Sequence, residues 1–551
     1  MAAVAVVLAA GKSTRMRSRL PKPAHLVGGR PMLAHVLSAA ATALQAPDES
    51  PSDAEPPRGA AEDHKARLVV VLGHESARVL QALATVPDLP PYRVALQPAQ
   101  RGTGDAVRAA MPLLTAATSA SPSSVLVLYG DTPLVRADTL RTLLALHQRT
   151  GAAVTFLTGE ASQPSGYGRV LRGPDGEVLG IVEEGHATDE QRRVTEVNSG
   201  IYCFAAEWLW SRLDRLRPHD SGEYYLTDLV DLAVHEGRTV ATVAASMSET
   251  AGVNDRLQLA EAEAYLRRRT LEDLMRSGVT VIDPTTTYVD STVRVGVDTV
   301  LHPFTTLQGA TRIGADCAIG PHSVVRDSAI GDNCLVVGSW LEEATMDPGS
   351  RVGPMSRLRP GAHLATGAHV GNFAEVKNAT LGAHVQMHHF SYAGDASIGA
   401  FTNVGAGTIT CNFDGARKHH TEVGEDVFLG SDTLLIAPVT LGDGARTGAG
   451  AVVRHDVPPG GVAVGVPARV IRHEEHPRTR RLPTIDPAQV PPVATPAALP
   501  ESLSVTAAPD GEPTSNTEQN PESTIPSQHG IAQAPSKAAE HQEGKELRLD
   551  G

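Results

Sequence analysis

A six-residue repeat in the second half of this 551-residue chain limits its possible folds more than any other feature. Large apolar residues return at every sixth position in two stretches, Val295, Leu301, Leu307, Ile313, Ile319 and Val423, Leu429, Leu435, Leu441. A period of six matches neither one face of an α-helix nor the alternation of a single strand. It predicts coils of three short parallel β-segments, each of which turns an apolar residue inward and stacks on the next coil. We therefore expect a parallel β-helix over Val295–Val453.

The repeat loses one residue in two places, between Ile319 and Val324 and between Val376 and Leu381. A loss of phase means that the coil does not close in its regular geometry at that point. We expect bulges or inserted loops at these two places.

The first half of the chain has a different pattern, in which apolar runs alternate with helical segments. Ala3–Ala9 is a continuous apolar run, as in a strand that is buried on both faces of a parallel sheet. Further segments continue the alternation: helix 31–44, strand 68–72, helix 75–83, strand 93–97, helix 103–114 and strand 125–129. Such a series predicts an α/β domain at 1–251 with a Rossmann-like, doubly wound parallel sheet. Val253–Met275 has apolar residues at helical spacing, which indicates a linker helix within 252–278 before the β-helix domain at 279–472.

Two segments hold most of the net charge of −14. Residues 46–66 carry six acidic and two basic side chains, and residues 482–551 carry ten acidic and three basic ones. Both segments are rich in Pro and poor in large apolar residues, so we expect a disordered insertion and a disordered tail. The rest of the chain is nearly neutral and has no basic face, which argues against a nucleic-acid partner.

The start of the chain and the cysteines indicate where the protein works. Ala2–Ala10 lacks the charged and apolar regions of a signal peptide, and no apolar run approaches the roughly 18 residues of a membrane span. The four cysteines show no CxxC pair, which is typical of a reducing compartment. We expect a cytoplasmic protein without a membrane span.

The turn after the first apolar run carries Gly11, Lys12 and Arg15, which suit a phosphate group. Taken alone, an ordinary strand-to-helix turn explains these residues equally well. The whole run Leu8–Met16, however, resembles the signature of the sugar-1-phosphate nucleotidylyltransferases, with Ser13 where that family usually has Gly. Three more motifs of that family follow in order, namely Leu20–Pro23 with Lys22, Gln97 with Gly102-Thr103, and Tyr129–Leu134 with Asp131.

This resemblance implies that a sugar-1-phosphate attacks the α-phosphorus of a nucleoside triphosphate and that pyrophosphate leaves. No protein nucleophile is needed, because alignment and neutralisation of phosphate charge supply the catalysis. Asp131 follows a buried strand, where such sheets present their ligands, and is the expected Mg²⁺ ligand. The family implies Asn254 as the second ligand, although an N-cap of the following helix is an alternative role for it.

The family also implies which residues surround the nucleotide. Arg15 and Lys22 would face the triphosphate. The remaining positions carried over from the family's nucleotide site are Leu8, Ala9, Gly11, Gln97, Gly102, Thr103, Tyr129 and Asn254.

Further motifs narrow the sugar. Gly166–Arg169, Ile181–Glu183, Glu196–Gly200 and Glu223–Asp228 resemble the branch of the family that forms UDP-N-acetylglucosamine. The resemblance implies a backbone contact from Gly168 and contacts to sugar hydroxyls from Glu183 and Asn198. As isolated residues, Glu183 would be an ordinary charge at a strand end and Asn198 a turn former.

The β-helix segment carries motifs of its own, Arg359–Gly361, Gly371–Lys377, Met387–Asp395 and Asn403–Gly415. Together they resemble the C-terminal half of the bifunctional bacterial UDP-N-acetylglucosamine synthases, and the resemblance extends over 3–472. Members of that family acetylate glucosamine-1-phosphate with acetyl-CoA and then transfer uridylyl from UTP to the product, which serves cell-envelope polysaccharides such as peptidoglycan. The family implies a left-handed β-helix, a homotrimer and Mg²⁺.

Acetyl transfer to an amine requires a base, because the amine must lose a proton, and a His with a near-neutral pKa suits this role. By motif position His389 is the base, and His388, which stands where the family usually has Gly, is a competing candidate. The remaining residues are carried over from the family: Arg359, Lys377, Tyr392 and Asn403 for the acceptor sugar phosphate, and Ala406, Asn412, Phe413, Ser431 and Ala449 for acetyl-CoA. In isolation, Arg359 and Lys377 would be solvated charges, and Asn403 would be a ladder Asn inside the β-helix.

One departure from the family concerns the CoA end of this site. The family places an Arg directly before a Val-Pro pair, but here Gly465 precedes Val466-Pro467. Arg469 or Arg472 is expected to replace that contact with the CoA phosphates.

We therefore expect a bifunctional acetyltransferase and uridylyltransferase. One alternative is a single-activity nucleotidylyltransferase whose β-helix is a structural rod, which the motifs between His389 and Asn412 disfavour. Another is a non-enzymatic exchange-factor subunit of translation initiation, which combines the same two domain types. The presence of both Lys22 and Asp131 disfavours that second alternative.

Removal of residues 482–551 is expected to leave acetyl transfer and uridylyl transfer within about twofold of the full-length rates, because the segment lacks the residues for a core. Thiol release from acetyl-CoA and pyrophosphate release from UTP measure the two half-reactions. Loss of either activity on truncation would assign the tail a role in that reaction.

Overall fold

The computed structural model describes residues 3–11, 14–45, 67–73, 75–116 and 122–473. The expected insertion at 46–66, the expected tail at 482–551, and Lys12 and Ser13 of the first motif lie outside the described residues. The chain divides into the units Met1–Ile485 and Asp486–Gly551, and only the first unit contains described residues.

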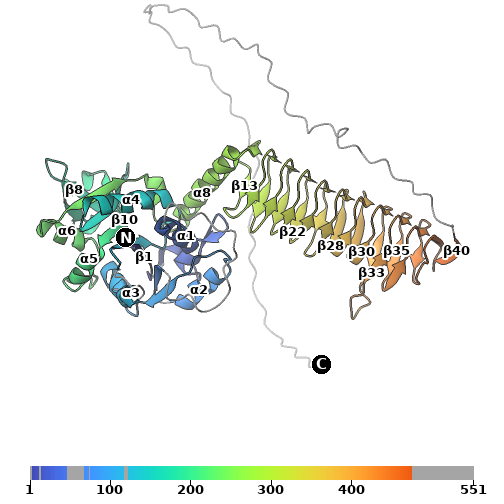
Figure 1. Ribbon diagram of the computed structural model, residues 1–551, viewed down its shortest axis with the longest axis horizontal. Helices are drawn as coiled ribbons and strands as arrows, with labels where there is room; N and C mark the ends of the chain where they lie inside the picture. The colour runs from blue at the N-terminus through green and yellow to red at the C-terminus, as the bar shows by residue number, and fades with distance from the viewer. Residues whose placement is uncertain (1–2, 12–13, 46–66, 74, 117–121, 474–551) are drawn as a thin grey trace, which may run out of the picture. The chain divides into compact units, whose positions relative to one another are not determined.

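A nine-stranded sheet forms the α/β part of the chain (Figure 1). Its main path runs β11-β7-β10-β6-β1-β4-β5, and β8 and β9 form a hairpin beside β10. The strands are β1 Ala3–Ala9, β4 Leu68–Leu72, β5 Arg93–Leu96, β6 Ser124–Tyr129, β7 Val154–Glu160, β8 Arg169–Arg172, β9 Val178–Val182, β10 Glu196–Ala205 and β11 Val240–Ala244, with a small separate pair, β2 Leu26–Val27 and β3 Arg30–Pro31. β10 runs antiparallel to β6 and β7, whereas the other pairs on the path are parallel. The predicted doubly wound sheet is confirmed, with β10 antiparallel on the main path and the antiparallel hairpin of β8 and β9 beside it.

Helices cover both faces of this sheet. They are α1 Met32–Leu44, α2 Ser76–Ala84, α3 Thr103–Ala116, α4 Ala137–Thr150, α5 Ala206–Leu213, α6 Asp228–His235, the single turn α7 Met247–Thr250, and α8 Arg256–Arg276. Helices α3, α5 and α6 share a core with Val4 and Val6 of β1, and α1, α2 and α4 share one with Ala5 and Val7. Because successive residues of β1 point to opposite faces, its unbroken apolar run serves both cores.

The predicted linker helix begins later than its apolar spacing indicates. Helix α8 starts at Arg256, since the carboxylate of Asp255 caps it by accepting a hydrogen bond from the Gln258 N–H at 2.9 Å. Val253 instead packs with Met32 and Leu266 in a small core of its own. The other predicted helices and strands agree with the structure to within two residues at each end.

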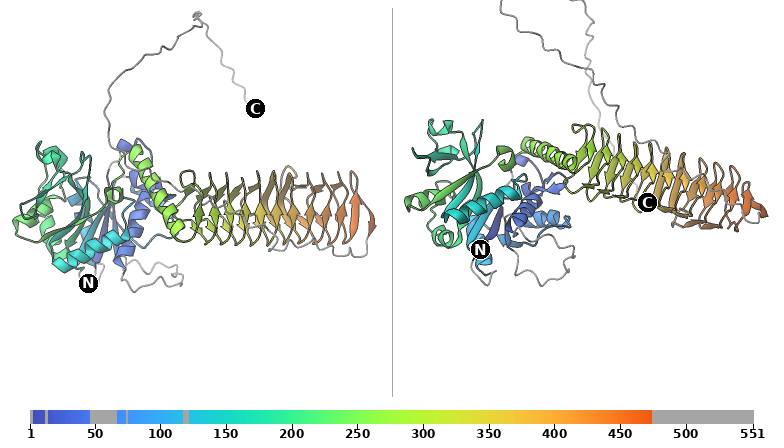
Figure 2. Two further views of the ribbon diagram at one scale, coloured as in Figure 1. Left: turned by 90° about the horizontal axis from the view of Figure 1, so that it is seen from above. Right: turned by 45° about the horizontal axis from the view of Figure 1, so that its top comes forward.

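The C-terminal half is a left-handed β-helix, in which two parallel sheets stack their strands as successive rungs (Figure 1, Figure 2). The 12-stranded sheet holds β12 Thr280–Val281, β15 Val300–Leu301, β18 Ala318–Ile319, β21 Leu335–Val336, β24 Arg351–Val352, β27 His369–Val370, β29 Gln386–Met387, β31 Asn403–Val404, β34 Phe428–Leu429, β37 Arg446–Thr447, β39 Gly461–Val464 and β40 Arg469–His473. The 17-stranded sheet holds β13 Tyr288–Val289, β14 Arg294–Val295, β16 Thr306–Gln308, β17 Arg312–Ile313, β19 Val324–Arg326, β20 Ala329–Ile330, β22 Trp340–Glu342, β23 Thr345–Met346, β25 Arg357–Leu358, β26 His363–Leu364, β28 Ala374–Leu381, β30 Ser391–Ile398, β32 Ile409–Cys411, β33 Thr421–Val423, β35 Leu434–Ile436, β36 Val439–Leu441 and β38 Val452–Val453. Only β40 runs antiparallel to its neighbour in these two sheets.

The core of the β-helix consists of the residues that set the period. Leu301, Leu307 and Ile319 are fully buried, and each pairs with a residue one coil further along. Leu301 pairs with Ile319, 18 residues on, but Ile319 pairs with Val336, 17 residues on. The bulge or inserted loop expected between Ile319 and Val324 is not found there, because the inward residue of the next strand is Val325, six positions on, and the coil loses one residue between Val325 and Ile330 instead. At the second expected place, Val376 and Leu381 are inward residues five positions apart within the single strand β28, so that coil is also shortened by one residue. Shortening preserves the stacking, because only the corner between two rungs changes.

The inserted loop lies elsewhere, between β32 and β33. Ile398 pairs with Val423, 25 residues on, rather than with a residue 16–18 positions on, so the eight residues Phe413–His420 are extra to the coil. This loop belongs to the second predicted site.

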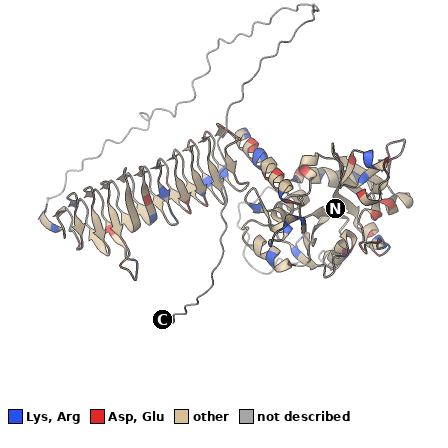
Figure 3. Cartoon of the chain, turned by 180° about the vertical axis from the view of Figure 1, so that it is seen from behind, with Lys and Arg blue, Asp and Glu red and all other residues tan. Residues whose placement is uncertain are grey.

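The cysteines, the helices and the distribution of charge complete the description of the fold. All four cysteines are free thiols, and Cys203, Cys317 and Cys334 are buried. No helix in the described part of the chain is long and apolar enough to cross a membrane. Acidic and basic residues are interspersed over the α/β part and along α8 (Figure 3).

Ile313→Ala is expected to lower the free energy of unfolding by about 2–5 kcal/mol, because its side chain lies inside the β-helix, where truncation leaves a cavity. Arg312→Ala, which removes the outward neighbour on the same strand, should change it by less than about 0.5 kcal/mol. Chemical unfolding followed by circular dichroism measures both. Equal losses would show that the inward and outward positions of β17 are assigned wrongly.

Candidate active sites

Four polar side chains meet at the carboxyl ends of β1 and β6. Lys22, in a short 3₁₀ turn, forms an ion pair with Asp131 and donates a hydrogen bond to Asn254 Oδ1 at 2.8 Å. Arg15 donates to the same Asn254 oxygen at 3.0 Å. The backbone N–H of Val253 donates to the Asp131 carbonyl at 2.9 Å and so fixes Asn254 beside Asp131. Tertiary structure thus joins the neighbouring motifs of Arg15 and Lys22 to Asp131 and Asn254, which lie far away in the sequence.

The two predicted metal ligands fit a divalent cation. The ammonium of Lys22 contacts oxygens of both Asp131 and Asn254, so the two oxygens already surround a single positive centre. The described residues contain no cluster of three or more His, Cys, Asp and Glu side chains that suits a metal. A site with two protein oxygens suits Mg²⁺ chemistry, in which phosphates and water complete the octahedron. The alternative role of Asn254 as the helix N-cap is wrong, because Asp255 is the cap.

The backbone at the end of β1 is accessible where a nucleotide would approach. The Gly130 N–H donates to the Leu8 carbonyl at 2.8 Å, which joins the ends of β1 and β6. A Cβ on Gly130 would lie 3.1 Å from the Ala9 side chain, whereas one on Gly11 would meet no described atom within 4 Å. The turn after β1 therefore exposes backbone at Gly11, as phosphate binding requires.

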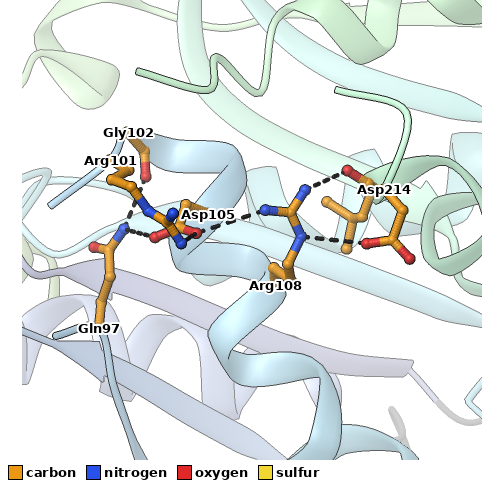
Figure 4. A network of polar contacts seen from close by, with 7 residues as sticks. Gln97, Arg101, Gly102, Asp105, Arg108 and Asp214 are labelled. Atoms are coloured by element: carbon orange, nitrogen blue, oxygen red, sulfur yellow. Dashed lines mark hydrogen bonds and ion pairs between the residues drawn. The ribbon is translucent and has the colours of Figure 1, made fainter. Parts of the chain in front are cut away.

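Gln97 is buried directly after β5. Its Nε2 donates to the Gly102 carbonyl at 3.1 Å and to Asp105 Oδ2 at 3.0 Å (Figure 4). Asp105 also pairs with Arg101 and Arg108. This network holds the turn that enters α3, so the described contacts of Gln97 shape the loop around the predicted nucleotide site.

Gly102, Thr103 and Tyr129 are linked through a neighbouring segment. Gly102 has φ +89°, and a Cβ there would lie 2.6 Å from the Tyr224 carbonyl oxygen, so no larger residue fits. Thr103 Oγ1 accepts a hydrogen bond from the Leu226 N–H at 2.9 Å. Burial raises the pKa of the Tyr129 phenol, as does the nearby Glu183 carboxylate, and the hydrogen bond with Thr103 opposes them. Tyr129 is therefore neutral and lies toward the sugar side.

The predicted sugar contacts lie together where β8, β9 and β10 meet. The Asn198 N–H donates to the Gly168 carbonyl at 2.9 Å, and a Cβ on Gly168 would lie 3.4 Å from Glu183 Oε2. Glu183 Oε1 accepts from the Thr227 hydroxyl at 3.1 Å. Asn198 Oδ1 accepts from the Gly200 N–H at 3.0 Å, so Asn198 is also the turn former that its residue type suggests.

Two residues near the sugar side were not predicted. Arg169 is almost fully buried, and its guanidinium pairs with Glu184 at 2.7 Å, which ties the Gly166–Arg169 loop to the segment after β9. The Tyr202 hydroxyl accepts from Asn198 Nδ2 at 2.6 Å. Arg169 belongs to a recognised motif, but only its burial reveals that it holds the loop rather than faces solvent.

The second set of predicted residues is built from successive coils of the β-helix. Register places Glu375 beside Tyr392, Lys377 beside Gly394, and Tyr392 beside Ile409. Arg359, after β25, pairs with Glu375 at 2.8 Å. One face of the rod thus carries a predicted site residue from each coil.

Three cations crowd together on this face. The nearby ammonium of Lys418 lowers the pKa of Lys377 most, and the Arg359 guanidinium lowers it further. Like charges at this separation favour an anion between them. Sequence reasoning did not predict Lys418, which lies in the inserted loop and outside the six-residue period. Its only signal was its place shortly after the recognised Asn403–Gly415 motif.

His388 and His389 have different surroundings, although both are exposed. His388 hydrogen-bonds to Gln386 Oε1 at 2.6 Å and packs its ring against His369, with ring centroids 4.5 Å apart. Burial, and then His389, lower the pKa of His388. Within the described residues, the His389 imidazole has no hydrogen-bond or ion-pair partner. The geometry therefore leaves His389 available for a substrate proton.

The predicted acetyl-CoA positions share one corner of the coils. Ala406, Ser431 and Ala449 each follow a Gly at this corner, and a Cβ on Gly405 or Gly430 would lie under 3 Å from the next coil. Asn403 lies in β31 beside Phe428. Asn412 is buried, whereas Phe413 is 60% exposed at the start of the inserted loop.

The structure leaves two candidates for the CoA phosphates. Arg469 stands opposite Val464 at the start of β40, and Arg472 stands opposite Val462. Both are exposed, so either side chain can reach an anion outside the last coil.

Comparisons with known proteins cover both halves of the chain. The MobA-like NTP transferase domain matches residues 5–253, and the hexapeptide repeat of succinyl-transferase matches residues 421–454. Bifunctional protein GlmU of Thermobifida fusca is 46% identical over 472 residues, which covers 85% of this chain and 93% of that protein. The proteins of the same name from Rhodococcus opacus and Mycobacterium tuberculosis are 45% and 42% identical, over 83% of this chain and 89% of each relative. Because these matches extend through both candidate sites, the chain belongs to the family of the bifunctional GlmU proteins.

Proposed function

We propose that this chain makes UDP-N-acetylglucosamine from glucosamine-1-phosphate in two steps. Membership of the family gives it an acetyltransferase and a uridylyltransferase activity. Residues 279–472 acetylate glucosamine-1-phosphate with acetyl-CoA, and residues 1–251 then transfer uridylyl from UTP, with 252–278 as the linker. The observation that carries the uridylyl assignment is the convergence of Lys22, Asp131 and Asn254 on one point.

In the uridylyl step the chain aligns two phosphates and neutralises their charge. Lys22 and Arg15 turn toward the triphosphate, whose oxygens compete for these cations with Asn254 Oδ1. Asp131 and Asn254 would hold Mg²⁺, which when bound would withdraw charge from the phosphate oxygens. The nucleotide lies along Leu8, Ala9, Gly11, Gln97, Gly102, Thr103 and Tyr129, and the sugar contacts Gly168, Glu183 and Asn198.

In the acetyl step the sugar amine attacks the thioester carbonyl and the CoA thiol leaves. His389 accepts the proton of the amine at an imidazole nitrogen. Arg359, Lys377 and Lys418 hold the sugar phosphate, which supplies the anion that these crowded cations favour. Tyr392 and Asn403 contact the sugar. Acetyl-CoA lies along the corner of Ala406, Ser431 and Ala449, with Asn412 and Phe413 beside it and Arg469 at the CoA phosphates.

The two alternatives from the sequence are disfavoured by the same comparisons. If the β-helix were only a structural rod, only the first half of the chain would need to match enzymes. If the chain were a non-enzymatic subunit, neither half would need to match them. The relatives named bifunctional match over more than four-fifths of this chain, including both sites.

We further propose a cytoplasmic homotrimer. Phe304, Met355, Phe373 and Phe390 occupy one corner of the β-helix coils, and each is more than half exposed. The register places His322 and Gly338 in the two coils between Phe304 and Met355, whereas Met355, Phe373 and Phe390 lie in consecutive coils. An aligned apolar row of this kind suits a contact between copies, because single exposed apolar residues are common but aligned ones are not. Side-by-side packing of three β-helices would cover this corner.

Asp131→Asn is expected to lower uridylyl transfer about 100-fold and to leave acetyl transfer unchanged, because it removes charge at the metal site only. His389→Ala should do the opposite, with a loss of about 10²–10⁴-fold in acetyl transfer. Each half-reaction is assayed separately with its own substrates. Loss of both activities to a similar extent in one variant would instead indicate a folding defect. His388→Ala tests whether His388, the competing candidate, is the base.

Lys418→Ala is expected to raise KM for glucosamine-1-phosphate about tenfold, because a charge-assisted phosphate contact is lost. KM for acetyl-CoA should change little. Arg417→Ala is the matched control, since Arg417 is the neighbouring exposed cation of the same loop. If both variants raised KM equally, the effect would be the general charge of the loop rather than a specific contact.

A further inference from the structure

A buried carboxylate lies beneath the predicted acetyl-transfer site. Asp395 is 9% exposed and has φ +47°, a left-handed conformation that Asp and Asn tolerate better than most residues. Asn378 has the same conformation one coil earlier, with φ +45°. Because Lys377 pairs with Gly394 and Tyr392 with Ile409, the register places Asn378, Asp395 and Asn412 at one position in three successive coils.

These three side chains form a single hydrogen-bonded chain. Asn378 Nδ2 donates to Asp395 Oδ1 at 2.6 Å, and Asn412 Nδ2 donates to Asp395 Oδ2. An ionised carboxylate only accepts hydrogen bonds. Both asparagines must therefore turn their NH₂ groups toward Asp395 and their carbonyl oxygens away from it. Asp395 thus determines the orientation of these two amides, because the shape of an amide group alone would allow either of its two orientations.

Asp395 remains charged in this position. Burial acts to raise its pKa, but the hydrogen bonds from Asn378 and Asn412 and the charges of Lys418 and Lys377 outweigh burial and lower the pKa. The carboxylate is thus also a counter-charge to the cations that would hold the sugar phosphate. Both of its oxygens already accept hydrogen bonds from the two asparagines, so we do not count Asp395 among the groups that touch substrate.

We propose that Asp395 is a positioning residue for acetyl transfer, which fixes the amide of Asn412 with its carbonyl oxygen directed away from the carboxylate and available to acetyl-CoA. The proposal rests on the assignment of the acetyl site in the proposed function. A purely structural role, in which the three residues only join neighbouring coils, predicts different effects of substitution.

Asp395→Asn separates the two roles, because it keeps the size of the side chain. The new amide at position 395 has one oxygen to accept with, and its own NH₂ group faces the NH₂ of one neighbour. One of the two neighbouring amides must then rotate or lose its hydrogen bond. We expect kcat/KM for acetyl transfer to fall about 10- to 100-fold, mainly through KM for acetyl-CoA, with uridylyl transfer unchanged.

A double variant restores the original direction of the amides. In Asn378→Asp combined with Asp395→Asn, the carboxylate moves one coil earlier and accepts from the NH₂ at position 395. The oxygen at position 395 then accepts from Asn412 Nδ2, which returns Asn412 to its orientation. We expect acetyl-CoA affinity, measured by calorimetry, and kcat/KM to recover to within about threefold of wild type.

The matched control is Asp327→Asn. Asp327 has the same left-handed conformation, φ +48°, in an earlier coil, and accepts from the Ala310 N–H at 2.8 Å far from the acetyl site. This variant should leave both activities unchanged.

Several outcomes would overturn the proposal. Wild-type acetyl transfer in Asp395→Asn would do so directly. A folded single variant with low activity that the double variant fails to restore would show that Asp395 acts through its charge or structure, not through the orientation of Asn412. If Asp395→Asn does not fold, the double variant alone tests the proposal, because it retains one carboxylate in the hydrogen-bonded chain of three residues. Unchanged acetyl transfer in His389→Ala would instead refute the site itself.

Discussion

The stacking of parallel coils is the interaction on which the C-terminal half of this protein depends. Each coil satisfies its backbone hydrogen bonds with the next one, as when the Val300 N–H donates to the Cys317 carbonyl at 2.8 Å. Each inward residue is buried by the coils above and below it, so no coil is stable alone. The same stacking builds the candidate acetyl site, because it places one residue from each coil side by side. Asn378, Asp395 and Asn412 lie in three different coils and are neighbours only because these coils stack.

The α/β half also brings together residues that are distant in the sequence, but it does so at one edge of a parallel sheet. Parallel strands bring their carboxyl ends to one edge, so the turns after β1 and β6 meet there. The cations of the first motifs and the oxygens of the later ones then lie within hydrogen-bond distance. Lys22 and Asn254 are held together by a hydrogen bond and by the backbone contact between Val253 and Asp131, not by proximity in the chain.

Much of the fold was predictable because local patterns report on burial. The six-residue period indicates which side chains point inward, and the apolar run of β1 indicates a strand between two layers of helices. The same patterns could not reveal Lys418, Arg169 or Asp395. Lys418 lies in a loop without a period, Arg169 is a charged residue that is buried against expectation, and Asp395 matters through neighbours one coil away. The alternative role of Asn254 as the N-cap of α8 stayed open for a similar reason, since Asn254 and Asp255 both suit that position by type and the structure gives it to Asp255.

The amino-acid sequence by itself determined the two architectures, the order of the motifs and the chemical types that each site contains. Period and motif spacing carry this information, because they depend on residues close together in the chain. Only the tertiary structure decided which side chains touch, which of two adjacent His residues is already engaged, and how the amide of Asn412 is turned. These properties depend on the register between coils and on the edge where strands end. Shortened coils and an inserted loop interrupt the period and shift that register, so the contacts follow from the folded chain alone.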